Sequence, residues 1–225
     1  FVAGSPLQVV SAVTYGDGDS TAIIAPPNSP AHSFKDLRGK RIATGKVSVG
    51  NYLLLRALEA NGMTIKDIQP VYMSPADAKA ALASGNIDAW STWSPFLATA
   101  IVQDGARVII DGKGLMSSHA YQVATRAAIT GKTAQLKDFL KRNTAAYLWA
   151  GAHQDAYAEA LSRDTGLPAE VARVMVRSIH PSAAPRKAQL LAEAEDVVKH
   201  LSAVSDAPVT PRPIAEAFAP EFRAD

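Results

Sequence analysis

Residues 41–62 read RIATGKVSVGNYLLLRALEANG, and this stretch decides the fold. Arg41–Thr44 has the composition of a short strand, and Gly45–Gly50 is a loop. Asn51–Asn61 then shows the apolar periodicity of a helix, which Gly62 ends. A strand that leads through a short loop into a helix is the repeating unit of a parallel sheet with helices on its faces.

The same order continues downstream of this stretch. Strands are expected at Ile68–Met73, Ile87–Trp90 and Arg107–Ile110, and helices are expected to start near Ser74 and Ser94. Strands that alternate with helices through short loops predict an α/β fold class with a parallel sheet.

The remaining residues flank this α/β unit on both sides. Apolar runs at 7–14 and 21–25 predict two strands before it, and one more strand is expected at Ala120–Thr125. Helices then dominate, at about 134–151, 154–163, 168–178, 185–203 and 212–219. Because the chain enters the α/β unit once and leaves it once, the two flanks can form a second domain together.

Composition excludes several classes of protein. The 225 residues include 23 Lys and Arg against 21 Asp and Glu, and a net charge of +2 is too weak for an electrostatic nucleic-acid binder. No apolar run approaches the roughly 18–20 residues that span a bilayer, so no membrane-spanning helix is predicted. The absence of cysteine excludes thiol nucleophiles, disulfides and cysteine zinc sites.

Catalytic and metal chemistry find little support in the remaining residues. The five histidines have no spacing typical of metal ligands, and Glu193 and Glu195 are expected on a solvated helix face. A Ser-His-Asp triad stays open, because its members are gathered in space rather than in sequence. We therefore predict a protein that is not an enzyme, with no catalytic residue, no metal site and no cofactor.

The first candidate site is the loop that leads into the helix after Gly50. A helix N-terminus carries free N–H groups and a partial positive charge, which suit an anion. Ser48 adds a hydroxyl, Val49 and Asn51 flank the helix start, and Gly50 lets a ligand approach the backbone. The alternative is that Ser48 or Asn51 simply caps the helix.

Two further candidates are aromatic. Trp90 and Trp93, followed by Ser94, lie where a parallel strand ends, which is the ligand-binding edge of open α/β sheets. His119 falls on the same strand face as Tyr121, where the chain leaves the α/β unit. The alternatives are two core tryptophans and a structural histidine.

Several segments, taken in order, resemble the periplasmic solute-binding proteins of ABC importers, in particular those of the aliphatic sulfonate, taurine and nitrate type. The resemblance covers nearly the whole chain. It is carried by Ser29–Ala43 (SPAHSFKDLRGKRIA), Leu53–Gly62 (LLLRALEANG), Asp67–Ala78 (DIQPVYMSPADA), Gly85–Trp90 (GNIDAW) and Trp93–Pro95 (WSP).

This resemblance implies a two-lobed periplasmic-binding-protein fold of type II. Residues 29–117 would be the complete second lobe, and residues 1–28 and 118–225 would form the first lobe, without its N-terminal part. The ligand would lie in the cleft between the lobes. The family's serine-rich loop aligns with Val47–Tyr52, its Trp-Asp-Pro motif with Trp93–Pro95, and its Asn-His/Tyr crossover with Ser118 and His119.

The function implied is that of a ligand-binding subunit that delivers a small organic anion, an aliphatic sulfonate above all, to the membrane permease of an ABC importer. Such a protein would be a monomer in the periplasm, or an extracellular lipoprotein tethered to the membrane. Two alternatives remain. One is an enzyme on the same fold, similar to a desulfinase or a thiamine-pyrimidine precursor protein. The other is the ligand-sensing domain of a transcription regulator.

Overall fold

The computed structural model describes residues 5–182, 187–205 and 213–222. The chain divides into two compact units. One comprises residues 17–117 and 154–178, and the other comprises residues 1–16, 118–153 and 179–225. The chain therefore passes from one unit to the other four times.

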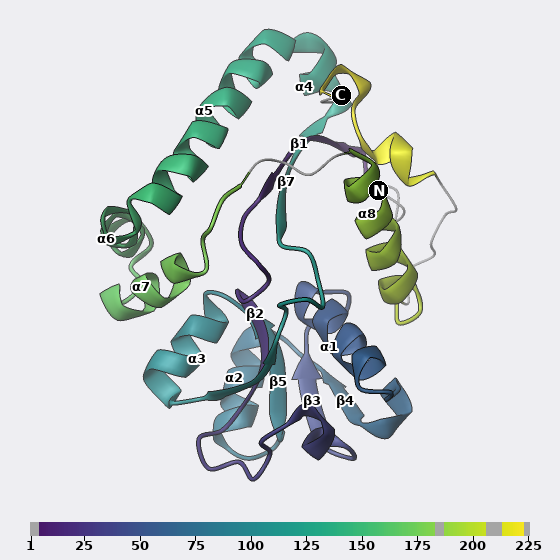
Figure 1. Cartoon of the computed structure of the whole chain (residues 1–225), viewed down its shortest axis with the longest axis vertical. Coiled ribbons are helices and arrows are strands. Elements are labelled where there is room, and N and C mark those ends of the chain that lie inside the picture. Colours follow the sequence, from purple (N-terminus) through teal and green to yellow (C-terminus); the bar gives the residue numbers. More distant parts are fainter. Residues whose placement is uncertain (1–4, 183–186, 206–212, 223–225) are drawn as a thin grey trace. The chain divides into compact units, whose positions relative to one another are not determined.

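The unit of residues 17–117 and 154–178 is built on a five-stranded sheet. Its strands are β2 (Thr21–Ala25), β3 (Arg41–Thr44), β4 (Gln69–Tyr72), β5 (Ala89–Trp93) and β6 (Arg107–Asp111). They lie in the order β4-β3-β5-β2-β6 (Figure 1). β3 pairs in parallel with β4 and with β5, which confirms the α/β pattern predicted from the alternation of strands and helices.

The unit that contains strand β2 differs from the predicted lobe. β2 lies inside this sheet, whereas residues 1–28 were assigned to the other lobe, and it pairs antiparallel with both β5 and β6. All of its residues are buried. A continuous apolar run predicts a buried strand but carries no information about its direction or about the sheet that it joins.

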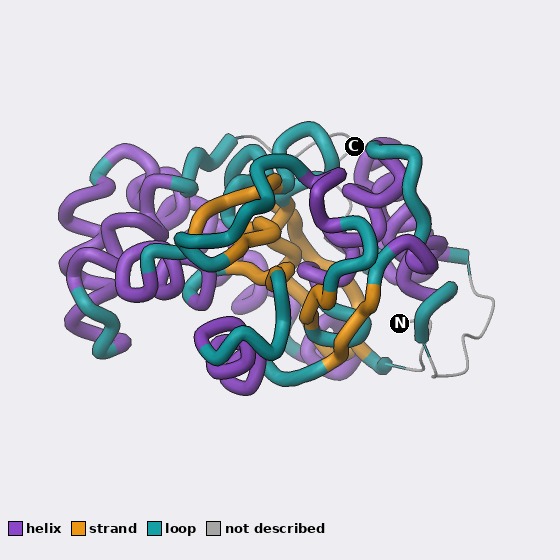
Figure 2. Tube along the Cα trace, turned by 90° about the horizontal axis from the view of Figure 1, so that it is seen from below, coloured by secondary structure: helices purple, strands orange, loops and turns teal. Residues whose placement is uncertain are grey.

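Helices cover both faces of this sheet (Figures 1 and 2). They are α1 (Val49–Ala60), α2 (Pro75–Ala83) and α3 (Phe96–Asp104), with the short 3-10 helices η1 (Phe34–Leu37) and η2 (Ile65–Asp67). Ile42 and the α1 residue Leu53 belong to the apolar core on one face. Trp90 and the α3 residue Leu97 belong to the core on the other face. Side chains alternate along each strand, so both cores are built from the same strands.

Two later helices, α6 (Gln154–Thr165) and α7 (Ala169–Arg177), belong to this same unit. Helix α7 packs against α3 and α6 and buries Val171 and Val176 completely. The lobes predicted from the sequence therefore differ from the compact units at residues 17–28 and 154–178. The apolar face of α7 is covered by a helix distant in sequence, which continuity of the chain does not reveal.

The other unit contains a two-stranded antiparallel sheet with helices. Its elements are β1 (Leu7–Thr14), β7 (His119–Thr125), α4 (Arg126–Gly131), α5 (Thr133–Ala152), α8 (Lys187–Ser202), η3 (Ile214–Ala217) and η4 (Pro220–Phe222). Thr14 pairs with His119 at one end of the sheet. Val10, Ile129 and Ala219 form a small core. The described part of this unit thus carries a sheet of two strands.

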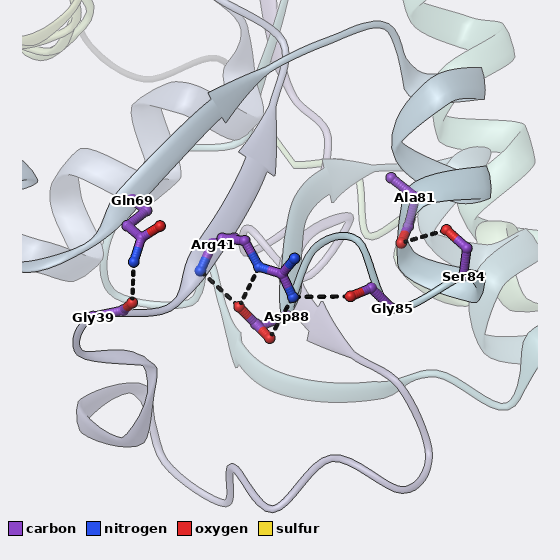
Figure 3. Close-up of polar contacts among 7 residues, drawn as sticks. All are labelled: Gly39, Arg41, Gln69, Ala81, Ser84, Gly85 and Asp88. Atoms are coloured by element: carbon purple, nitrogen blue, oxygen red, sulfur yellow. Dashed lines mark hydrogen bonds and ion pairs between the residues drawn. The ribbon is translucent and has the colours of Figure 1, made fainter.

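An ion pair joins the starts of β3 and β5 in the five-stranded sheet (Figure 3). One Asp88 carboxylate oxygen accepts from the Arg41 backbone N–H at 2.8 Å and from Nε at 3.1 Å, and the other accepts from Nη2 at 3.1 Å. Nη2 also donates to the Gly85 carbonyl at 2.8 Å. The hydrogen bonds from Arg41 lower the pKa of Asp88 below its ordinary value. The pair therefore ties the turn before β5 to β3.

We expect Asp88→Asn to destabilise the protein at pH 7, and we expect the difference from the wild type to shrink in acid. The folded-state pKa of Asp88 is lowered, so its contribution is complete above the ordinary carboxyl value of about 3.9 and is lost as the pH falls through the folded value. Urea unfolding between pH 3 and pH 7 measures this. Asp138→Asn, which breaks an exposed pair with Arg142, should change little. A pH-independent deficit for Asp88→Asn would contradict the assignment.

The first turn of α1 packs so closely against the sheet that one methyl group added at Gly50 should destabilise the protein. A β-carbon added at Gly50 would lie 2.6 Å from the Ser91 carbonyl oxygen and 3.0 Å from Thr44 Oγ1. Gly50→Ala should lower the free energy of unfolding by about 1–3 kcal/mol, because the backbone must move apart. Gly131→Ala in α4 is the matched control, since no atom lies within 4 Å of the added carbon. Equal stability of both variants in urea unfolding would argue against the close contact.

Candidate functional site

The candidate site lies at the carboxyl ends of β3, β4 and β5. Parallel pairing brings these ends to one edge of the sheet, with Thr44 of β3 beside Tyr72 of β4. Helix α1 starts at this edge, one short loop after Thr44. Ligands of open α/β sheets bind at this kind of edge, where loops follow the strands.

Ser48 organises the start of α1. Its Oγ accepts the Asn51 backbone N–H at 3.1 Å and donates to the Gly45 carbonyl at 2.6 Å. It is therefore a helix cap, as one of the two interpretations of the sequence proposed. The backbone N–H groups of Val49 and Gly50 lie in the first turn, where no helix carbonyl can accept them. The site thus combines a cap with amides available to an anion.

The loop before this helix holds a strained residue. Val47 has φ 55°, in the left-handed region that a β-branched side chain disfavours. Strain of this kind costs on the order of 1–3 kcal/mol and concentrates at ligand sites. Val47 and Val49 expose 47% and 39% of their surface, so two apolar side chains stand beside the amides of the first turn.

Asn51 is the residue that most strongly indicates a ligand. It is fully buried, and neither its amide oxygen nor its amide nitrogen has a partner among the described residues. Thr44 Oγ1, also fully buried, is in the same situation. Buried polar groups are nearly always hydrogen-bonded, and leaving one unpaired costs about 1–3 kcal/mol. These groups therefore call for a polar partner from outside the chain, either a ligand or ordered water.

The two predicted tryptophans have different surroundings. Trp90 is 1% exposed and belongs to the core with α2 and α3, which is the structural alternative weighed for it. Trp93 is partly exposed, and its Cη2 would lie 3.8 Å from a β-carbon added at Gly45, so the ring lies next to Gly45 in the loop before α1. Phe96 packs edge-on against Trp93 at 5.9 Å between ring centroids. The structure therefore brings Trp93, and not Trp90, next to Gly45 in the loop that leads to α1.

Helix α3 starts two residues after Ser94, where the sequence predicted a helix start. Helix α3 begins at Phe96, and its N-cap, Pro95, makes no side-chain cap bond. The Ser94 backbone N–H donates to the Ser20 carbonyl at 2.9 Å, which ties the end of β5 to the start of β2.

His119 lies in the other unit, at the start of β7, and is largely buried. Its Nε2 lies 2.7 Å from Glu193 Oε2 of α8. The expectation that Glu193 belongs to a solvated face is therefore wrong. The ring of His119 also packs edge-on against Tyr121, as expected for two residues on one strand face. Burial, and secondly the Glu193 carboxylate, raise the pKa of Tyr121 to about 12.

Sequence reasoning missed four residues at the sheet edge. Thr44 and Ser91 are polar side chains inside buried strands, and Ser91 Oγ donates to the Gly50 carbonyl at 2.6 Å. Lys46 Nζ lies 5.4 Å from the centroid of the Tyr72 ring. A polar residue at the carboxyl end of an otherwise apolar strand was the available signal for Thr44. The Lys46–Tyr72 contact depends on strand pairing and had no local signal.

Comparisons of the sequence and of the structure with known proteins both find proteins named for binding sulfonates. An aliphatic sulfonates-binding protein of Escherichia coli (strain K12) is 36% identical over 149 residues, which are 66% of this chain and 47% of that protein. The alkanesulfonate-binding protein SsuA from Xanthomonas axonopodis pv. citri, solved bound to MOPS, superposes with a TM-score of 0.83 at 28% identity. That match covers 99% of this chain and 76% of the other. The chain spans about half the length of the curated relatives that it matches.

An enzyme shares the fold at a greater distance. The desulfurization enzyme DSZB has a TM-score of 0.66 at 18% identity and covers 96% of this chain and 78% of its own. The model of the NMT1/THI5-like family matches residues 2–157. This match extends over more than half of the sequence and includes the whole five-stranded sheet and the start of α1. The chain belongs to the NMT1/THI5-like family.

Proposed function

We propose that this chain is the ligand-binding component of an ABC importer and that it captures a small organic sulfonate at the first turn of α1. The observation that carries the proposal is the fully buried, unpaired amide of Asn51 beneath the helix start that Ser48 caps. The relatives named for binding aliphatic sulfonates and alkanesulfonates support the choice of ligand.

The chemistry of the site suits a monoanion. A sulfonate spreads one negative charge over three oxygens, so several neutral donors and the helix N-terminus can share it. The Val49 and Gly50 amides and the Asn51 amide supply such donors. The segment 44–52 contains one cationic residue, Lys46, and no arginine, which disfavours a phosphate with two or three charges.

We propose binding without turnover. The sequence contains no cysteine, so a thiol nucleophile cannot act on the ligand. Among the described residues, no helix combines the length and the apolar character needed to cross a membrane. We infer that the protein hands its ligand to the permease of the importer. It would do so as a monomer in the periplasm or as a tethered lipoprotein.

Asn51→Leu separates stability from binding. The wild-type amide has no partner to lose, so the free energy of unfolding should change by less than about 1 kcal/mol or rise. Affinity for ethanesulfonate should fall by about tenfold or more, the scale of one hydrogen bond to a charged group. Calorimetry and urea unfolding measure the two effects.

Asn61→Ala, at the C-cap of the same helix, provides the matched control. Its side chain donates to the Ala57 carbonyl at 2.8 Å, so this variant should lose stability and keep its affinity. If Asn51→Leu bound ethanesulfonate as tightly as the wild type, the proposed site would be wrong.

Trp93 should report binding by fluorescence. Its ring lies next to Gly45 in the loop before α1, whereas Trp90 is buried and Trp149 lies in α5 of the other unit. A sulfonate should change the emission saturably in the wild type and in Trp149→Phe, and the change should be lost in Trp93→Phe. Mass spectrometry should recover the sulfonate intact; release of sulfite would favour the enzyme alternative.

A further inference from the structure

Positive charge is concentrated in the segment that forms α4 and the first half of α5. Residues 126–142 contain five basic residues and one acidic residue, which is a net charge of +4. The other 208 residues contain 18 basic and 20 acidic residues, which is a net charge of −2. The excess of positive charge in this protein therefore belongs to one short part of the chain.

The basic side chains of this segment are exposed. Arg142 Nε lies 2.8 Å from Asp138 Oδ2, and Asp138 is the one acidic residue in the sequence between Asp111 and Asp155. Among the described residues, the other four basic side chains of the segment have no ion pair: Arg126, Lys132, Lys137 and Lys141. A cluster of exposed cations of this kind attracts an anionic surface.

Helix α5 packs against its own unit through one face. Leu136 and Leu140, which are four residues apart, lie against the small core of this unit. Ala150, further along the helix, is buried as well. The residues between these positions point away from the core, because side chains on a helix share a face at intervals of three, four and seven residues.

The exposed face of α5 combines positive charge with large apolar side chains. Lys141 precedes Leu148 by seven residues, and Arg142 precedes Trp149 by seven, so each pair shares a face of the helix. Leu148 and Trp149 expose 53% and 46% of their surface. We call these four residues, together with Lys137 one turn before Lys141, the α5 outer face. It is basic in its first half and apolar in its second half.

The arrangement of these side chains suits a surface with many charges rather than one small anion. The basic residues are spread along the segment 126–142 and do not form a single loop or turn. Lys137 and Arg142 are separated by a helical rise of about 8 Å, which is about one Debye length at physiological salt. Their charges therefore act together on a surface that lies along the helix.

A lipid bilayer fits both halves of the α5 outer face. Anionic phospholipids supply phosphate groups for the basic half, and the boundary with the acyl chains directly beneath them can receive Leu148 and Trp149. Tryptophan is enriched at this depth of the membrane. The Trp149 ring stacks on His153, with 5.0 Å between the ring centroids, so it is held at the surface of the protein. A nucleic acid has no apolar layer beneath its phosphates.

We propose that the α5 outer face binds the surface of a membrane that contains anionic phospholipids. Lys137, Lys141 and Arg142 contact lipid phosphates, and Leu148 and Trp149 enter the boundary between the head groups and the acyl chains. The proposed sulfonate site lies in the other unit and plays no part in this binding. For a component of an importer, the contact keeps the protein close to the membrane that holds the permease.

Vesicle flotation with the full chain tests the proposal. We expect the protein to float with vesicles of phosphatidylcholine and phosphatidylglycerol mixed at about two to one, and not with vesicles of phosphatidylcholine alone. Salt at about 0.5 M should release most of the bound protein, because it screens exposed charges.

Two double variants with the same change of net charge assign the binding to the α5 outer face. Lys137→Gln with Lys141→Gln should weaken binding by about 25-fold, since each basic residue at an anionic surface contributes about fivefold. Lys35→Gln with Lys66→Gln removes two exposed charges from the other unit and should leave binding within about twofold.

Tryptophan fluorescence tests the apolar half. Emission should shift to shorter wavelength on vesicles with phosphatidylglycerol as Trp149 leaves water. The shift should be lost in Trp149→Phe and kept in Trp93→Phe. Asn51→Leu should bind these vesicles as the wild type does, so a failure of the sulfonate site and a failure of this proposal are distinguishable.

Several results would overturn the proposal. Absence of flotation, equal flotation with both kinds of vesicle, or an equal loss in the two double variants would show that the α5 outer face does not recognise anionic lipid. Flotation with phosphatidylcholine vesicles only when they carry the permease would make a protein the partner instead. A dimer in sedimentation that is lost in Lys137→Gln with Lys141→Gln, without vesicle binding, would assign the face to a second copy of the chain.

Discussion

The contact between the first turn of α1 and the middle of β5 is the constraint on which the site depends. The Ser91 carbonyl and Thr44 Oγ1 leave no space for a side chain at Gly50, and Ser91 Oγ donates to the Gly50 carbonyl. The helix start is therefore held by the sheet, while Ser48 holds it from the loop side. The amides of the first turn point along the helix axis toward the loop, so a rigid support lies directly behind them.

Local pattern was sufficient for the strand and helix that carry the site. β3 has the predicted bounds, and α1 starts two residues before the predicted position because Ser48 takes the capping role. Local pattern could not show which of the two tryptophans, Trp90 or Trp93, is buried and which is partly exposed. β5 continues to Trp93 rather than ending at Trp90, so Trp90 lies inside the strand, where it is buried, and Trp93 lies at its end, where it is partly exposed.

The features that the sequence did not predict depend on contacts between segments that are distant along the chain. The antiparallel direction of β2 is set by its neighbours β5 and β6, both far along the chain. The pairing of Glu193 with His119 likewise joins α8 to β7, and a helical pattern alone shows only which positions share a face. The same limit concealed the Lys46–Tyr72 contact, which exists because Thr44 and Tyr72 are register partners.

The central position of β2 has a consequence for the order in which the protein is made. β2 is the first strand of its sheet to be synthesised, yet it lies between β5 and β6, the last two. Ile23 and Ile24, fully buried in the folded unit, have no sheet partner until β5 has been synthesised, and their second partner strand, β6, follows later still. The sheet of this unit can therefore be completed only late in synthesis, and until then the apolar strand β2 is open to the wrong contacts that lead to aggregation.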